Sequence, residues 1–153
     1  MGIKPAGGSD SFGVFDVTAS ALAAERSRLA VIAQNIANAQ VTGNEKSPPY
    51  RRQRAVFETE LAEAMQRGRV GGRAGGGVAG GVKVRIEGVP GEFPRMPMPG
   101  DPHADKDGWV QTSNVNVVDE MVDMLDASRS YEANLTALRT WRKMLEQTIE
   151  MAR

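Results

Sequence analysis

Residues 117–151 read VVDEMVDMLDASRSYEANLTALRTWRKMLEQTIEM, and the apolar pattern of this stretch decides the fold. One row of large residues recurs every seven positions, at Val117, Met124, Tyr131, Leu138 and Leu145. A second row, offset by four, holds Met121, Leu135 and Ile149. This alternation over about five heptads predicts one long helix with coiled-coil packing, capped at its start by Asn116. At 1.5 Å per residue, the helix is on the order of 50 Å long.

The N-terminal residues predict a second helix, from about residue 11 to residue 41. Its large residues also recur every seven positions, at Phe15, Leu22, Leu29 and Ile36. Asp10 or Ser11 can cap the start of this helix, and Gly43 is expected to end it in the left-handed conformation. The seven-residue spacing of both helices favours near-parallel packing in a left-handed supercoil.

The middle of the chain, residues 45–112, contains most of the prolines and glycines and does not have a helical pattern. Apolar and charged residues alternate over 82–89, which predicts a half-buried strand. Shorter strands are expected at 55–57 and 109–111, and residues 90–107 are expected to form a loop rich in Pro and Asp.

The fold class is therefore predicted as mainly α with a small β insert, in which two long terminal helices form a coiled coil. The predicted regions are an N-terminal helix in 1–44, a β-rich or irregular middle in 45–112 with a Gly-rich insert at 67–81, and a C-terminal helix in 113–153.

Composition excludes several classes of function. Lys plus Arg and Asp plus Glu both number 19, and the resulting zero net charge argues against nucleic-acid binding, which needs a basic excess. The chain has no Cys and one His, so thiolate or multi-histidine metal sites and a Cys nucleophile are not expected. We also expect no membrane span and no cleaved signal peptide, because no apolar stretch is long enough for either.

Two motifs resemble sites of chemistry, and both have simpler explanations. Residues 75–80 match the glycine spacing of dinucleotide-binding loops, but the match lies in a glycine-dense tract that no strand precedes. Asp101, Asp105 and Asp107 suggest a cation loop, yet their spacing favours a solvated turn, and His103 has no clear partner as a base. The sequence therefore predicts no cofactor, no metal and no enzymatic activity.

The two helices carry more apolar surface than the rest of the chain can cover. The shorter N-terminal helix would cover only part of the longer one, and glycine-rich coil with short strands cannot cover the remainder. We therefore expect the helices to pack against other chains. One hypothesis is a soluble homo-oligomeric coiled-coil adaptor, which would form a closed oligomer by itself.

Specific strings favour a different assembly. GVFDV at 13–17 and NIANA at 35–39 resemble the N-terminal signature of flagellar rod and hook proteins. PYRR at 49–52 resembles the segment that follows it. NVNVVDEMVDM at 114–124 and ASRSYEAN at 127–134 are very similar to the C-terminal motifs of basal-body rod members of that family.

The resemblance implies a structural subunit of the proximal rod in the periplasm, whose terminal helices form an inner tube of coiled coils around the export channel. It also implies export by the flagellar type III apparatus, and partners that are other rod proteins and further copies of this chain. Residues 1–11 and 67–81 depart from the family pattern. The predicted subunit-interface residues are Phe15, Leu22, Leu29, Asn35, Ile36, Asn38, Val117, Met121, Met124, Tyr131, Asn134, Leu135, Leu138, Leu145 and Ile149.

Overall fold

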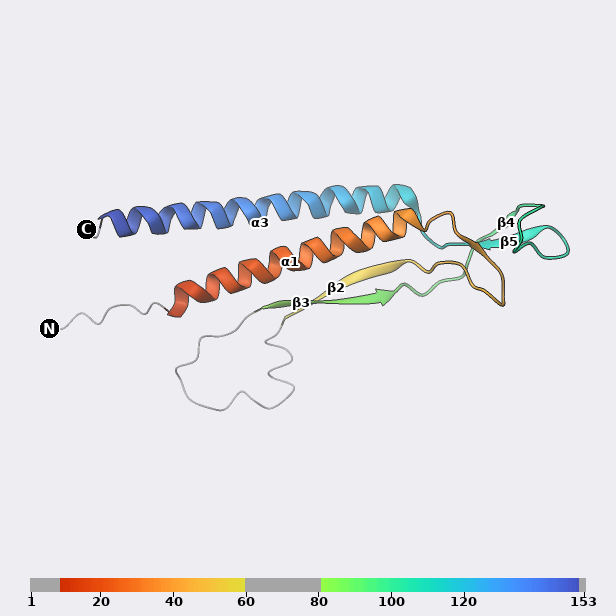
Figure 1. The fold of residues 1–153 in the computed structure, drawn as a ribbon, viewed down its shortest axis with the longest axis horizontal. Coiled ribbons are helices and arrows are strands. Elements are labelled where there is room, and N and C mark those ends of the chain that lie inside the picture. Colours follow the sequence, from red (N-terminus) through yellow and green to blue (C-terminus); the bar gives the residue numbers. More distant parts are fainter. Residues whose placement is uncertain (1–8, 60–80, 152–153) are drawn as a thin grey trace, which may run out of the picture. The chain divides into compact units, whose positions relative to one another are not determined.

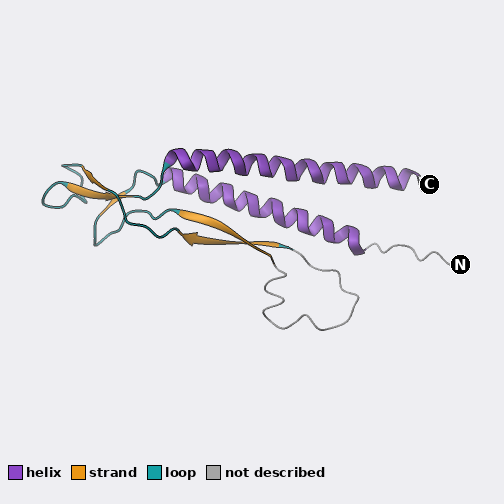
Figure 2. Cartoon of the chain, turned by 180° about the vertical axis from the view of Figure 1, so that it is seen from behind, coloured by secondary structure: helices purple, strands orange, loops and turns teal. Residues whose placement is uncertain are grey.

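The computed structural model describes residues 9–59 and 81–151 (Figure 1). About half of these residues are helical, and the others form strands and loops, as Figure 2 shows by type. The elements in chain order are α1 (Ser9–Ala37), β1 (Thr42–Gly43), β2 (Gln53–Thr59), β3 (Val82–Gly88), β4 (Arg95–Pro97), β5 (Trp109–Thr112) and α3 (Val117–Met151).

Helix α3 spans the range that its apolar rows predict, with 35 residues. The Asn116 side chain accepts a hydrogen bond from the Val118 amide at 3.1 Å, which confirms the predicted N-cap. Asp119 and Glu120 lie in the first turn, where the helix dipole favours negative charge.

Helix α1 has 29 residues and ends at Ala37, four residues before the predicted end. Asn38 ends it with a turn, in which its amide and its side-chain Nδ2 both donate to the Gln34 carbonyl, at 3.1 and 2.8 Å. The prediction that Gly43 ends this helix in the left-handed conformation was therefore wrong. Gly43 is buried in β1, where a Cβ atom would lie within 3 Å of the backbone of Ser47, Pro48 and Pro49.

The predicted strands at 55–57, 82–89 and 109–111 are confirmed as β2, β3 and β5. Strands β2 and β3 pair as a two-stranded sheet, and a second sheet has the order β1-β5-β4. Both pairings of this second sheet are antiparallel, with Thr42 opposite Thr112 and Arg95 opposite Gln111.

Strand β4 corrects the prediction that residues 90–107 form only a loop. Its three residues include Pro97, which lies opposite Trp109. Because β4 is at the edge of its sheet, Pro97 can occupy it without breaking a ladder of bonds on both sides. A strand this short and this exposed has no alternating apolar pattern from which it could be predicted.

The chain forms two compact units. One unit takes its described residues from 1–26, 57–85 and 129–153, and the other contains 27–56 and 86–128. The buried apolar residue of the first unit is Ala24, and those of the second are Val31, Ile32, Val110 and Ala127, counted over the described residues. The second unit also buries three polar residues, Asn35, Ser113 and Glu120, which makes its interior unusually polar for its size.

Within the described parts of the chain, neither α1 nor α3 contains a stretch that is long and apolar enough to cross a bilayer.

Candidate assembly surface

A buried asparagine organises the second unit. Asn35, in the last turn of α1, is 1% exposed. Its Nδ2 donates to the Glu120 carboxylate at 2.9 Å and to the Gln53 carbonyl at 2.7 Å. Its Oδ1 accepts from the Gln53 amide at 3.0 Å and from the Tyr50 hydroxyl at 2.9 Å. An amide side chain has two donors and two acceptor positions, so Asn35 uses its full capacity within its own chain.

Glu120 is the second part of this arrangement, and none of its side chain is exposed. The Arg52 Nε lies 2.5 Å from Glu120 Oε1, and the Arg52 Nη2 lies 3.1 Å from Asp123 Oδ2. The hydrogen bond to Glu120 raises the pKa of Arg52, so the guanidinium remains charged. We call Asn35, Tyr50, Arg52, Gln53 and Glu120 the junction cluster.

The junction cluster joins three separate parts of the chain: the end of α1, the segment 50–53 and the first turn of α3. Burial raises the pKa of Tyr50, and the charge of Glu120 adds to this, so the hydroxyl stays protonated as the donor to Asn35. A buried carboxylate is strongly unfavourable unless a cation and hydrogen bonds compensate it. The cluster meets both needs and thereby fixes the first turns of α3 against the end of α1.

On the opposite side of the first turns of α3, the side chains are apolar and exposed to solvent. Val118 is 68% exposed, Met121 and Val122 are each 54% exposed, and Leu125 is 60% exposed. Their spacing of three, four and seven residues places them on one stripe, on the side of α3 away from the buried Glu120 and Ala127. We call Val118, Met121, Val122 and Leu125 the α3 apolar face. Exposed apolar stripes are typical of surfaces that bind another molecule, which makes the α3 apolar face the candidate assembly surface.

The residues predicted at the interface occupy different environments. In α1, Leu22, Leu29, Ile36 and Asn38 are half-buried and Asn35 is buried, whereas the side chain of Phe15 lies outside the described residues. In α3, Met121 and Ile149 are exposed, and the half-buried ones are Val117, Met124, Tyr131, Asn134, Leu135, Leu138 and Leu145. Their contacts with other subunits stay a prediction.

Sequence reasoning missed several residues of the α3 apolar face and of the junction cluster. Val118, Val122 and Leu125 belong to neither heptad row, although a helical projection of the first two turns of α3 would have grouped them with Met121. Nothing in the sequence signals that Arg52 and Glu120 meet, because 68 positions separate them along the chain.

The acidic loop that suggested a cation site forms a set of turns. Asp105 Oδ1 accepts from the amides of Asp107 and Trp109, at 3.0 and 2.9 Å, and its Oδ2 accepts from Arg95 at 3.0 Å. Asp101 accepts from the amide of His103 at 2.7 Å, and this bond is the main cause of the lowered pKa of Asp101.

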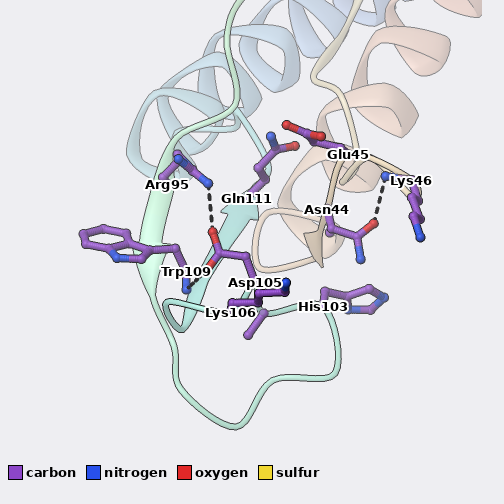
Figure 3. A pocket seen from close by; sticks show the side chains of 11 residues that line it. Asn44, Glu45, Lys46, Arg95, His103, Asp105, Lys106, Trp109 and Gln111 are labelled. Carbon is purple, nitrogen blue, oxygen red and sulfur yellow. Dashed lines mark hydrogen bonds and ion pairs between the residues drawn. The ribbon is translucent and has the colours of Figure 1, made fainter.

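An open depression of about 590 Å³ lies beside these turns, where loop residues meet the edge of the β1-β5-β4 sheet. Figure 3 shows Asp105 between Arg95 and the backbone of Trp109, on the wall of this depression. No set of three His, Asp or Glu residues able to hold a metal ion occurs among the residues that the structure describes. The glycine motif at 75–80 lies outside them.

Comparison with known proteins identifies the class at both ends of the chain. Residues 15–43 match the family model described as Flagella basal body rod protein. Residues 106–151 match the model described as Flagellar basal body rod FlgEFG protein C-terminal. The two matched segments contain most of α1 and all of α3, so the class is that of flagellar basal-body rod proteins.

Relatives extend the similarity over nearly the whole chain. The flagellar basal-body rod protein FlgC of Salmonella typhimurium is 37% identical over 90% of this chain and 95% of its own length. FlgC of Agrobacterium fabrum is 39% identical, over 88% of this chain and 90% of its own length. FlgC of Bacillus subtilis is 36% identical, over 94% of this chain and 99% of its own length. The chain belongs to the FlgC family of flagellar basal-body rod proteins.

Proposed function

We propose that this protein is a structural subunit of the bacterial flagellar rod, held in place by contacts of its helices with neighbouring subunits. The observation that carries the proposal is the α3 apolar face, which a single chain leaves bare although the turns beneath it are fixed by the junction cluster. A surface that is both rigid and apolar suits permanent assembly, because burying each such side chain contributes about 1.5–3 kcal/mol. The family's basal-body rod relatives agree with this role.

The finer role that we propose is that of a proximal-rod subunit in the periplasm. The heptad rows support packing of the terminal helices as coiled coils in an inner tube that lines the export channel. Many small dispersion contacts along such helices would resist sliding between subunits and so transmit torque. Export through the flagellar type III apparatus, without a cleaved signal peptide, completes this proposal.

A structural role also fits the polar groups of the molecule. The junction cluster has its donors and acceptors bonded to one another, and Asp105 is occupied by turn amides and Arg95. The relatives are rod proteins, which agrees with a subunit that performs no catalysis. No observation favours the soluble homo-oligomeric adaptor.

The proposal can be tested in the bacterium that encodes this chain. Deletion of the gene should leave cells that do not swim and whose isolated basal bodies have no rod, and a plasmid copy should restore both. Leu125→Glu places a charge on the α3 apolar face without disturbing the buried side of the helix, so it should fail to restore rods. The matched control is Glu132→Gln, at another exposed position of α3, which should restore them. Complete rods in the deletion strain would refute the proposal.

A further inference from the structure

We propose that the α3 apolar face is covered by the C-terminal end of α3 from a second copy of this chain, in a head-to-tail contact. The inference rests on the proposed rod function and names the partner of the same surface. It follows from the exposure and the charge of the two ends of α3: both ends expose apolar side chains, the first end has no cation, and the second has a small excess of cations.

The first end, residues 117–126, is apolar with an acidic border. It carries Asp119, Glu120, Asp123 and Asp126 and has no Lys or Arg. Glu120 is buried and Asp123 is bonded to Arg52, but no ion pair is found for Asp119 or Asp126 in the part of the chain that the structure describes. The helical period places both of these carboxylates along one side of the α3 apolar face.

The other end, residues 139–151, exposes apolar side chains and carries charges of both signs, with Arg139, Arg142 and Lys143 against Glu146 and Glu150. Met144 is 52% exposed and Met151 is 82% exposed, and their spacing of seven residues puts them on one stripe. Lys143 borders this stripe and makes no ion pair among the described residues, whereas Arg142 is bonded to Glu146 within the helix. Methionine packs readily against varied apolar surfaces, which suits it to such a contact.

The helix dipole does not explain these charges. It favours Asp119 and Glu120 in the first turn, but Asp126 lies in the third turn, beyond the range of the effect. At the other end, the last turn has no basic residue, and Lys143 lies two turns before the end of the helix. Asp126 and Lys143 are therefore available for a partner.

Charge also decides how two copies meet. Two acidic ends brought together would place Asp126 of one copy near Asp126 of the other, and like charges across an interface oppose association. Contact between the acidic end and the end that carries Lys143 brings Asp126 and Lys143, which have opposite charges, together. Such a contact joins different surfaces of the two copies, so it leaves one surface of each kind free and can continue as an open helical array.

Disulfide trapping tests the contact in the full chain. The protein has no cysteine, so Leu125→Cys and Met144→Cys each introduce a unique thiol at an exposed position. One variant carries a mass tag, and the two are mixed, oxidised and separated on a non-reducing gel. We expect the mixed dimer to exceed both same-variant dimers several-fold. The control is Glu45→Cys, at an exposed position outside α3, mixed with Met144→Cys, which should give only the background level.

Charge reversal tests the electrostatic part. Asp126→Lys in the Leu125→Cys chain should lower the mixed dimer about two- to five-fold, as expected for an exposed ion pair. Lys143→Glu in the Met144→Cys chain should restore it, and this rescue excludes misfolding as the cause of the loss. High salt should lower the yield of the mixed dimer between Leu125→Cys and Met144→Cys chains, and it should leave the background dimer of the control pair unchanged.

Three results would overturn the inference: a mixed dimer no more abundant than the control, a dominant dimer of two Leu125→Cys chains, or a reversal without rescue. Each of them leaves the rod function standing if deletion of the gene still abolishes rods. Rods that persist in the deletion strain would instead remove the function itself.

Discussion

Replacing Arg52 by alanine removes the cation from a carboxylate that water cannot reach. In the native protein, Glu120 is fully buried, with Arg52 on one oxygen and Asn35 on the other. After the substitution only the Asn35 bond remains, and a negative charge is left in the interior of the second unit. We therefore expect a large loss of stability from a residue whose own side chain is 29% exposed.

The magnitude follows from the exposure of each partner. Removing one member of a fully buried ion pair costs about 3–5 kcal/mol. Because Arg52 is partly exposed, water can enter the space that it leaves and solvate Glu120 in part, which lowers this cost. The pair with Asp123, which is 41% exposed, adds less than about 1 kcal/mol. We expect Arg52→Ala to lower the free energy of unfolding by about 2–4 kcal/mol.

The chain offers a matched control two residues away. Arg54 lies 3.5 Å from Glu87, and its side chain is 61% exposed. Arg54→Ala removes the same type of side chain from an exposed ion pair, so it should cost about 0–1 kcal/mol.

Urea unfolding followed by far-ultraviolet circular dichroism measures both variants, and a loss larger than the total stability would appear as an unfolded chain. Glu120→Gln should recover part of the stability in the Arg52→Ala background, because it removes the unpaired charge. If Arg52→Ala were no more harmful than Arg54→Ala, or if Glu120→Gln made it worse, the reasoning about the junction cluster would be refuted.

Three further predictions concern single positions. Gly43→Ala should lower the free energy of unfolding by about 1–3 kcal/mol in the same urea assay, because the new methyl group would collide with the backbone of residues 47–49. The control Gly91→Ala should have little effect, since the Cβ there would lie 3.5 Å from its nearest neighbour. Absorbance titration at alkaline pH should show a late-titrating tyrosine that Tyr50→Phe removes. Burial raises the pKa of Tyr50 above its value in the unfolded chain. The protonated Tyr50 therefore contributes its full stabilisation below the unfolded pKa of about 10, and this contribution is lost as the pH rises through the pKa of the folded protein. In nuclear magnetic resonance spectra, the carboxyl group of Asp101 should titrate below its ordinary pKa, because the hydrogen bond from the His103 amide favours the carboxylate. The stabilisation that the Asp101 carboxylate contributes is present above the pKa of the unfolded chain and is lost as the pH falls through the pKa of the folded protein. Asp101→Asn should abolish this pH dependence of stability.

The features that could be predicted from the sequence are those that depend on local periodicity and on composition. The seven-residue rows predicted α3 between its observed bounds, and alternation over 82–89 predicted β3, because side chains on one face of a helix or strand repeat at a fixed interval. The signature strings at both ends were enough to indicate the rod family, which the relatives then showed.

Only the tertiary structure decided which polar groups meet and which apolar groups stay bare. Asn35 and Glu120 are 85 positions apart, and no local rule connects them. The heptad row that holds Met121, Leu135 and Ile149 did not include Val118 or Leu125, which the structure leaves exposed beside Met121 on the α3 apolar face. Periodicity identifies which residues share a face of a helix, but what covers that face depends on the contacts that the rest of the chain makes, and these form only on folding.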